Sequence, residues 1–147
     1  VQEVLPLLSS SVKILLSGAT PSSEVLGLRS SQVKVKGWIK DIRISYDSAN
    51  IFVAPMHTGT GLQNKLLEAM SMKLPCVTTQ LVNNAVKAKR DNEIIIAHSK
   101  EEFAAEISNL LSDEAKRESV AANGQKFVQS NFSWDVFNKK LEDILTT

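Results

Sequence analysis

In the segment 55–75, four residues have the types and spacing to bind a phosphorylated ligand. Gly59 and Gly61 follow a short apolar run, and glycine lets the backbone adopt positive φ and approach a phosphate closely. They precede a predicted helix, whose N-terminus presents free N–H groups and a positive dipole. At about 100° per residue, Gly61, Lys65 and Glu68 share one narrow stripe of that helix. Lys65 could neutralise a phosphate, and Glu68 could accept hydrogen bonds from vicinal hydroxyls.

A simpler interpretation of the same residues stays open. Glycines are common in turns, and a lysine and a glutamate three positions apart can form a surface ion pair that stabilises a helix by roughly 0.2–0.5 kcal/mol. Two named phosphate-binding motifs are excluded. A P-loop needs serine or threonine directly after its lysine, but Leu66 follows Lys65. A dinucleotide fingerprint needs three spaced glycines, but only Gly18 follows the first predicted strand.

The hydropathy pattern predicts a parallel sheet that would position these residues. Short β-branched apolar runs alternate with amphipathic stretches, which is typical of βαβ units. The predicted strands are Val12–Ser17, Gln32–Lys36, Ile51–Ala54, Cys76–Thr79 and Glu93–Ala97. The last three are nearly uninterrupted apolar runs, as expected of strands covered on both faces. The glycine turn would then lie at the carboxyl end of a strand, where such sheets gather their ligands.

The predicted helices flank the sheet and continue beyond it. Their spans are 22–28, 41–46 with Asp41 as N-cap, 61–74, one beginning after Ser99, one from Asp113 to about Gln129, and one after Ser133 that carries Trp134, Phe137, Leu141 and Ile144. Ser99 and Glu102 form a capping box. No strand separates the last three helices. The sequence therefore predicts an α/β fold, a Rossmann-like three-layer sandwich with a mostly parallel five-stranded sheet and a C-terminal helical flank.

Composition excludes several classes of function. The 147 residues carry 17 basic and 16 acidic side chains, a net charge of +1, and the size suits one globular domain. Scattered basic residues argue against a nucleic-acid-binding protein. No apolar run approaches the roughly 18–20 residues that span a bilayer. Cys76 has no partner for an internal disulfide or a metal site, so we expect a buried, inert thiol and a cytoplasmic location.

Six sequence blocks, in order, resemble one protein family. They are VKILLSGA at 12–19, VKVKGWIKD at 33–41, ANIFVAP at 49–55, the glycine-containing core at 59–70, LPCVTT at 74–79 and NFSW at 131–134. The core pattern G-x-G-x-x-x-K-x-x-E-A-M is matched by Gly59, Gly61, Lys65, Glu68, Ala69 and Met70. Over nearly its whole length, the chain resembles the C-terminal, nucleotide-sugar-binding domain of the group 1 (family 4) retaining glycosyltransferases of GT-B fold.

The resemblance implies a set of donor-binding residues. Glu68 matches the second glutamate of the family's E-x7-E motif and would bind the ribose hydroxyls of the nucleotide, with Lys65 at the phosphate. The residues expected at the diphosphate and sugar are Gly18, Gly59, Thr60 and Gly61, and those expected beside the nucleobase are Gly37, Trp38 and Ile39. Trp38 could stack on the base, although a tryptophan directly after a strand more often serves packing.

The sequence departs from the family pattern at three places. Thr60 stands where the commoner branch has a glutamate that contacts the donor sugar. His57 stands where the closer branch often has arginine, so it could offer a weaker, pH-dependent contact or be an exposed loop residue without a role. We interpret 80–87 as a loop that lacks the family's usual glycine. These departures concern recognition of the donor sugar rather than the fold.

The resemblance also implies parts of a larger protein. Residues 1–147 match a single donor-binding domain, truncated at its N-terminus, without the family's opening central strand and without the acceptor-binding N-terminal domain. With that strand absent, the family order 3-2-1-4-5-6 is expected to contract to 2-1-3-4-5. A gap in its place would leave an unpaired sheet edge that could drive dimerisation.

The implied activity belongs to the full-length protein. It is the transfer, with retention, of a sugar from a nucleoside diphosphate sugar to an acceptor in polysaccharide or glycoconjugate synthesis. The full-length protein could also associate peripherally with a membrane. It would need no metal and no cofactor, and we assign no catalytic residue to this segment, which we expect to be inactive alone. Two alternatives stay open: a non-catalytic nucleotide-binding module, and a flavodoxin-like interaction domain, although residues 17–20 lack the acidic pair of a receiver.

Overall fold

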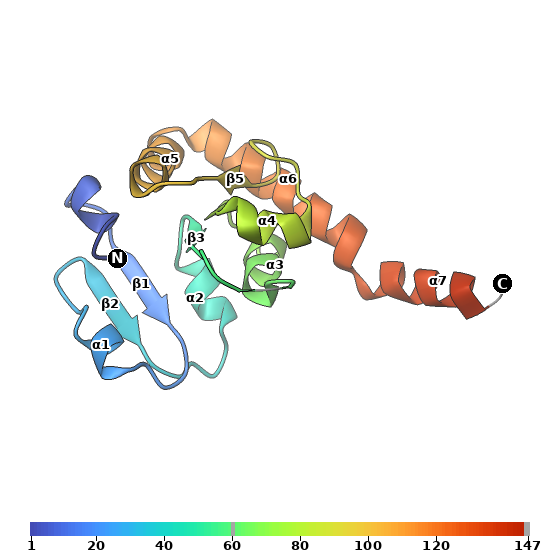
Figure 1. Cartoon of the computed structure of the whole chain (residues 1–147), viewed down its shortest axis with the longest axis horizontal. Helices are drawn as coiled ribbons and strands as arrows, with labels where there is room; N and C mark the ends of the chain where they lie inside the picture. Colours follow the sequence, from blue (N-terminus) through green and yellow to red (C-terminus); the bar gives the residue numbers. More distant parts are fainter. Residues whose placement is uncertain (60, 146–147) are drawn as a thin grey trace.

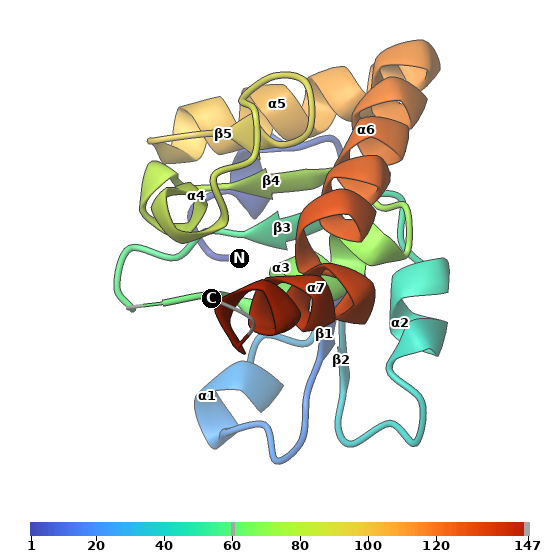
Figure 2. The same cartoon turned by 90° about the vertical axis from the view of Figure 1, so that its right-hand side faces the viewer.

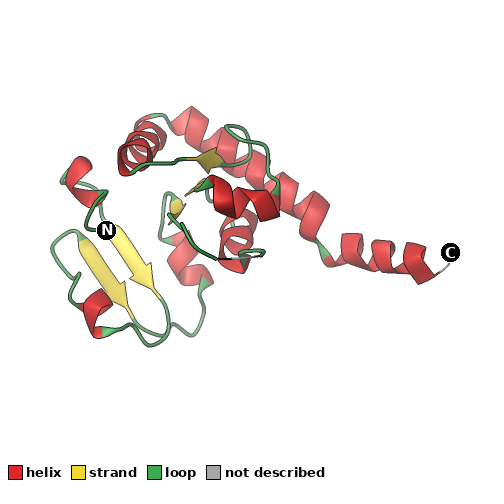
Figure 3. Ribbon diagram, in the orientation of Figure 1, coloured by secondary structure: helices red, strands yellow, loops and turns green. Residues whose placement is uncertain are grey.

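The computed structural model describes residues 1–59 and 61–145, apart from the side chains of residues 135, 137, 140 and 141. Helices surround short parallel strands (Figures 1 and 3). The elements, in chain order, are the 3₁₀ turn η1 (Leu5–Leu7), β1 (Ile14–Ser17), α1 (Ser23–Leu26), β2 (Val33–Lys36), α2 (Arg43–Asp47), β3 (Phe52–Ala54), α3 (Asn64–Ser71), β4 (Cys76–Thr78), α4 (Gln80–Val86), β5 (Ile95–Ile96), α5 (Lys100–Ser112), α6 (Glu114–Phe132) and α7 (Trp134–Leu145). Each predicted strand is present, and the α/β class is confirmed.

The strands form two parallel sheets. β1 pairs with β2, and a second sheet has the order β3-β4-β5. Our prediction of one continuous sheet with β1 beside β3 is therefore wrong. Figure 1 shows the β1–β2 pair standing apart from β3. β1 and β3 share no ladder hydrogen bonds, so the gap that the sequence analysis considered lies between them.

The strands of the two sheets differ in how deeply they are buried. The residues of β1 are all half-buried, whereas every residue of β4 is buried. β4 has a strand on each side and helices on both faces, as its uninterrupted apolar run predicts. Dimerisation through the unpaired edge of β1 or β3 stays a prediction.

The β3-β4-β5 sheet has an apolar cluster on each face. On one face, residues of β3, β4 and β5 pack against α3, α4 and α6, with Leu66, Ala69 and Met70 of α3 almost completely buried. On the other face, Val77 and Ile95 pack against α5. Figure 2 shows these strands side by side with helices around them. The three-layer arrangement is thus confirmed for this sheet.

Local capping signals place several helix ends. Ser99 accepts a hydrogen bond from Glu102 N at the start of α5, and Asp113 accepts one from Lys116 N at the start of α6. α2 begins later than predicted, at Arg43, whose N–H donates to Asp41 Oδ1. The C-terminal helical flank is confirmed, and α7 projects away from the body in Figure 1.

The interpretation of residues 80–87 as a loop is wrong, because 80–86 form α4. Val82 and Val86 lie one turn apart and are both buried in the core. The Asn83 side chain closes the helix end by donating to Ala88 O and accepting from Ala88 N, each at 3.0 Å. Lys87 takes the left-handed conformation, with φ of 63°, that glycine commonly takes after a helix. Asn83 and Lys87 thus end this helix without a glycine.

Candidate functional site

Two glycines in the turn between β3 and α3 have backbone conformations that favour glycine. Gly59 has φ of 125° and Gly61 has φ of 88°, values that strain any residue with a Cβ. Figure 3 shows this segment as a loop. α3 begins at Asn64, slightly later than predicted, and Gln63 before it makes no side-chain capping hydrogen bond. The first backbone N–H groups of α3 therefore have no side-chain cap from Gln63 and can donate hydrogen bonds to another group. Thr60 lies outside the described residues, so its predicted role is not addressed.

Lys65 and Glu68 do not pair with each other. Both side chains are described, and no ion pair closer than 4.0 Å joins them. The simpler interpretation, a surface ion pair on α3, is therefore wrong. Both side chains are exposed. The charge of Lys65 is available to a ligand.

Glu68 has a different partner, which sequence reasoning missed. The hydroxyl of Tyr46 donates a hydrogen bond to Glu68 Oε2 at 2.8 Å and lies 3.4 Å from the carbonyl oxygen of Lys65. Burial first, and the hydrogen bond to Glu68 second, raise the pKa of Tyr46 above its ordinary value. The phenol is thus a neutral donor at physiological pH. No local pattern signals this contact, because its residues lie far apart along the chain.

Gly18 and Gly37 follow neighbouring strands. Ser17 pairs with Lys36 at the end of the β1–β2 ladder, so the two glycines leave the sheet side by side. A Cβ added to either would meet no atom within 4 Å, and neither has positive φ. Packing and backbone conformation within the described residues therefore give no reason for glycine here. Close approach by a ligand would supply one.

Helix α2 links these glycines to the stripe on α3. Ser45 Oγ lies 3.0 Å from Ser17 Oγ, next to Gly18, and the following residue, Tyr46, contacts Glu68. Consecutive residues of α2 thus hold two of the predicted ligand-binding segments. The structure brings together parts that the sequence separates widely.

Trp38 lies on the surface with its side chain 74% exposed. The expectation that it serves packing is wrong for the described part of the chain, and its ring is free to stack on a ligand. Ile39 beside it is half-buried.

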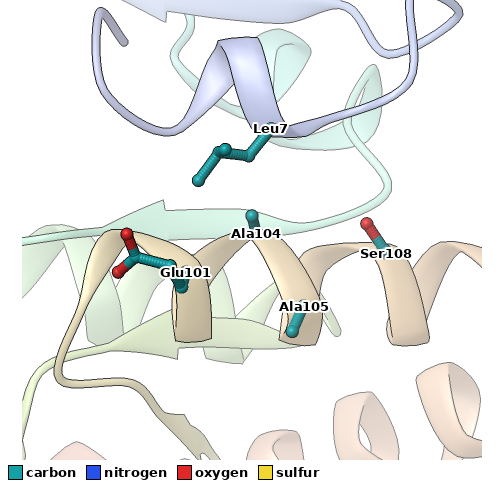
Figure 4. A pocket seen from close by; sticks show the side chains of 5 residues that line it. All are labelled: Leu7, Glu101, Ala104, Ala105 and Ser108. Atoms are coloured by element: carbon teal, nitrogen blue, oxygen red, sulfur yellow. The ribbon is translucent and has the colours of Figure 1, made fainter.

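His57 is exposed and borders a hollow of about 260 Å³ with Pro55, Lys100, Phe103 and residues 1–4. A second hollow, of about 270 Å³, lies between η1 and α5 (Figure 4). Its lining residues are Leu7, Glu101, Ala104, Ala105 and Ser108. Neither hollow includes Gly59, Lys65 or Glu68. Of the predicted donor-binding residues that the structure describes, His57 is the one that lines either of these two hollows.

The described residues also bear on metal binding and on membrane insertion. In that part of the chain, no three His, Cys, Asp or Glu side chains are grouped so that they could hold a metal ion. There is also no helix among them with the length and apolar character to cross a membrane.

Comparison with known proteins decides the family. A family model described as "Glycosyl transferases group 1" matches residues 1–113, well over half of the chain. The chain belongs to the group 1 glycosyl transferases. The family match agrees with the resemblance carried by the six sequence blocks and does not favour the flavodoxin-like alternative.

Two curated relatives of this group 1 glycosyl transferase chain are matched over part of their own length. The capsular polysaccharide biosynthesis glycosyltransferase CapM of Staphylococcus aureus is 32% identical over 105 residues, which are 69% of this chain and 27% of CapM. An uncharacterised 44.6 kDa protein from the cps region of Klebsiella pneumoniae is 27% identical over 63% of this chain and 24% of its own length. The chain spans about a quarter of the curated relatives that it matches.

A solved structure confirms the fold. Crystal structures of HepE from Anabaena superpose with a TM-score of 0.83, at 16% identity, over 99% of this chain and 44% of HepE. At this identity the likeness shows the fold alone. The group 1 glycosyl transferase chain has the Rossmann-like architecture of that protein, with its strands in two short sheets.

Proposed function

We propose that this chain binds the donor in a glycosyltransferase that moves a sugar from a nucleoside diphosphate sugar to an acceptor, in polysaccharide or glycoconjugate synthesis. The observation that carries the proposal is the α3 stripe. Lys65 and Glu68 lie exposed behind a turn that two positive-φ glycines shape, and they are not paired with each other. CapM is named for capsular polysaccharide biosynthesis, and HepE has been crystallised with UDP and with UDP-glucose, which supports the class of ligand.

Different residues would bind different parts of the donor. Backbone N–H groups of the glycine turn and the start of α3 would face the diphosphate, with Lys65 neutralising its charge. Glu68 would accept hydrogen bonds from the ribose hydroxyls. Gly18 and Gly37 would leave room for the ligand, with Trp38 and Ile39 at the base. The family pattern assigns contact with the sugar to the position of Thr60, and His57 could add a weaker contact.

We extend the proposal to the reaction of the whole protein. The departing diphosphate helps to deprotonate the acceptor, the sugar is transferred with retention, and oriented N–H groups and Lys65 stabilise the growing negative charge. No metal, cofactor or side-chain nucleophile of this segment takes part. The acceptor pocket belongs to a further domain, so the chain alone binds donor without transferring sugar. Its location is cytoplasmic.

Calorimetric titration tests donor binding. UDP, GDP and their sugars are titrated into the chain, and we expect at least one to bind. Lys65→Ala should weaken that binding about tenfold, since one charge-assisted hydrogen bond is worth roughly 1.5 kcal/mol or more. Lys126→Ala, which removes an equal charge from an exposed position of α6, should bind as the parent does. Absence of binding by every nucleotide at millimolar concentration would refute the proposal.

A second candidate is a nucleotide-binding module without transferase activity. Thr60 favours it, because this residue replaces the glutamate that contacts the donor sugar in the commoner branch. An assay of sugar transfer with the full-length protein separates the two. Donor binding without transfer to any acceptor tested would favour the module, and Thr60→Glu would then show whether the missing carboxylate is the reason.

A further inference from the structure

Glu68 is held in place from outside its own helix. Its carboxylate oxygen Oε2 accepts the 2.8 Å hydrogen bond from the hydroxyl of Tyr46, a residue of α2. Tyr46 itself has little freedom. Its side chain is 7% exposed, belongs to the apolar cluster that includes Leu66 and Met70, and packs at 6.0 Å between ring centroids against Phe52 of β3. An immobile donor thus fixes one oxygen of an otherwise exposed glutamate.

The other carboxylate oxygen is available. Among the described residues, Glu68 Oε1 accepts no hydrogen bond, and the backbone carbonyl of Glu68 is satisfied within and after α3. A carboxylate has about four acceptor sites on its two oxygens. One hydrogen bond from Tyr46 therefore leaves enough acceptor sites for a pair of neighbouring hydroxyls. It also reduces the rotamers that the glutamate must give up when it binds them.

We propose that Tyr46 is a positioning residue, which orients the Glu68 carboxylate toward the ribose hydroxyls of the bound nucleotide. This inference rests on the proposed function. Tyr46 does not touch the ligand in this arrangement and acts through Glu68. Because burial and the hydrogen bond to Glu68 raise its pKa, the phenol keeps the proton that it donates throughout the physiological range.

A purely structural role for the same hydrogen bond makes a different prediction. If it only joined α2 to α3, its loss would weaken the binding of every nucleotide equally, by lowering the folded or ordered fraction. A positioning role changes only the part of the affinity that depends on the ribose hydroxyls. The ratio of affinities for a ribonucleotide and its deoxy analogue separates the two roles.

The test compares UDP with 2′-deoxy-UDP, or GDP with 2′-deoxy-GDP if only guanine nucleotides bind. The parent should prefer the ribonucleotide about tenfold or more, as expected for one hydrogen bond to a charged group. Glu68→Gln should reduce this preference strongly. Tyr46→Phe should reduce it about three- to tenfold while leaving the affinity for the deoxy nucleotide within about twofold of the parent. The deoxy nucleotide thus also reports that the variant is folded.

Ser48→Ala is the matched control. It removes another hydroxyl hydrogen bond from the end of the same helix, from Ser48 Oγ to Ser45 O at 3.0 Å, without touching Glu68. We expect it to keep the parental preference. If Tyr46→Phe keeps that preference while Glu68→Gln loses it, or if Tyr46→Phe weakens both nucleotides equally, Tyr46 is not a positioning residue. If the parent binds neither nucleotide, or if Glu68→Gln keeps the preference, the assignment of Glu68 fails and this inference with it.

Discussion

The backbone of α6 passes so close to the segment that leads into β5 that a Cβ on Gly124 would lie 2.8 Å from the carbonyl oxygen of Glu93. Gly124 is buried, and the nearest side-chain atom to the added carbon would be Met70 Cε at 3.3 Å. The backbone carbonyl cannot rotate away as a side chain can. The absence of a side chain at Gly124 therefore allows α6 to pack this closely against the segment before β5.

Gly124→Ala should destabilise the fold by about 1–2 kcal/mol, because the cost of overpacking, roughly 1–3 kcal/mol, exceeds the gain of about 1 kcal/mol in helix propensity. The urea midpoint should fall at constant slope. Gly27→Ala is the control, since its Cβ would make only ordinary contacts at 3.4 Å and its φ of −66° suits alanine. Equal stability of the two variants would contradict this account of Gly124.

Gly18→Ala and Gly37→Ala should each weaken nucleotide binding without destabilising the fold. Neither position has positive φ or a neighbour within 4 Å of an added Cβ, so the free energy of unfolding should stay the same or rise by up to about 1 kcal/mol. Nucleotide affinity should fall roughly fivefold or more, since an added methyl against a close ligand costs about 1–3 kcal/mol. Calorimetry and urea unfolding measure the two effects. Unchanged affinity in both variants would place the ligand elsewhere.

Trp38→Ala should weaken nucleotide binding, because stacking of a base on an aromatic side chain is worth about 1–3 kcal/mol. Its side chain is 74% exposed, so the stability of the fold should change by less than about 0.5 kcal/mol. Binding should quench the tryptophan fluorescence of the parent but not that of the variant. Trp134→Ala is the control, because Trp134 is 81% exposed on α7 and should not affect affinity. A quench that disappears with Trp134 and persists without Trp38 would overturn the assignment.

The fold should lose stability at alkaline pH. Burial raises the pKa of the Cys76 thiol above its ordinary value of 9.0, so above pH 9 the unfolded chain releases this proton while the folded chain keeps it. The unfolded state then binds fewer protons, and the free energy of unfolding falls as pH rises, by up to about 1.4 kcal/mol per pH unit. The raised pKa of Tyr46 acts in the same direction above pH 10.

Urea unfolding between pH 8 and 10 measures this slope. Cys76→Ala should give a shallower decline than the parent, whatever its stability at pH 7. Val77→Ala, a truncation at the adjacent and equally buried position, should keep the parental slope. A parental slope in Cys76→Ala would show that the thiol does not contribute.

Features that depend on neighbours along the chain were open to prediction from the sequence. The alternation of apolar runs with amphipathic stretches predicted all five strands. The uninterrupted runs at β4 and β5 also predicted their burial, because a strand covered on both faces is apolar throughout. The helix starts capped by Ser99 and Asp113 could be predicted from the sequence, because each cap bonds to a residue three positions further along the chain. The glycine turn and the stripe of Lys65 and Glu68 were likewise visible, since helix geometry sets the spacing.

Tertiary structure alone decided the rest. Residues 80–86 became helical because the core buries Val82 and Val86, and Asn83 satisfies the backbone that follows. The separation of β1 from β3 reflects pairing between distant segments, which no local pattern specifies. The partner of Glu68 was decided in the same way: Glu68 follows Tyr46 by 22 positions in the chain, and only the packing of α2 beside α3 joins them. Local chemistry thus determined which groups this protein could use, and long-range packing determined which of them meet.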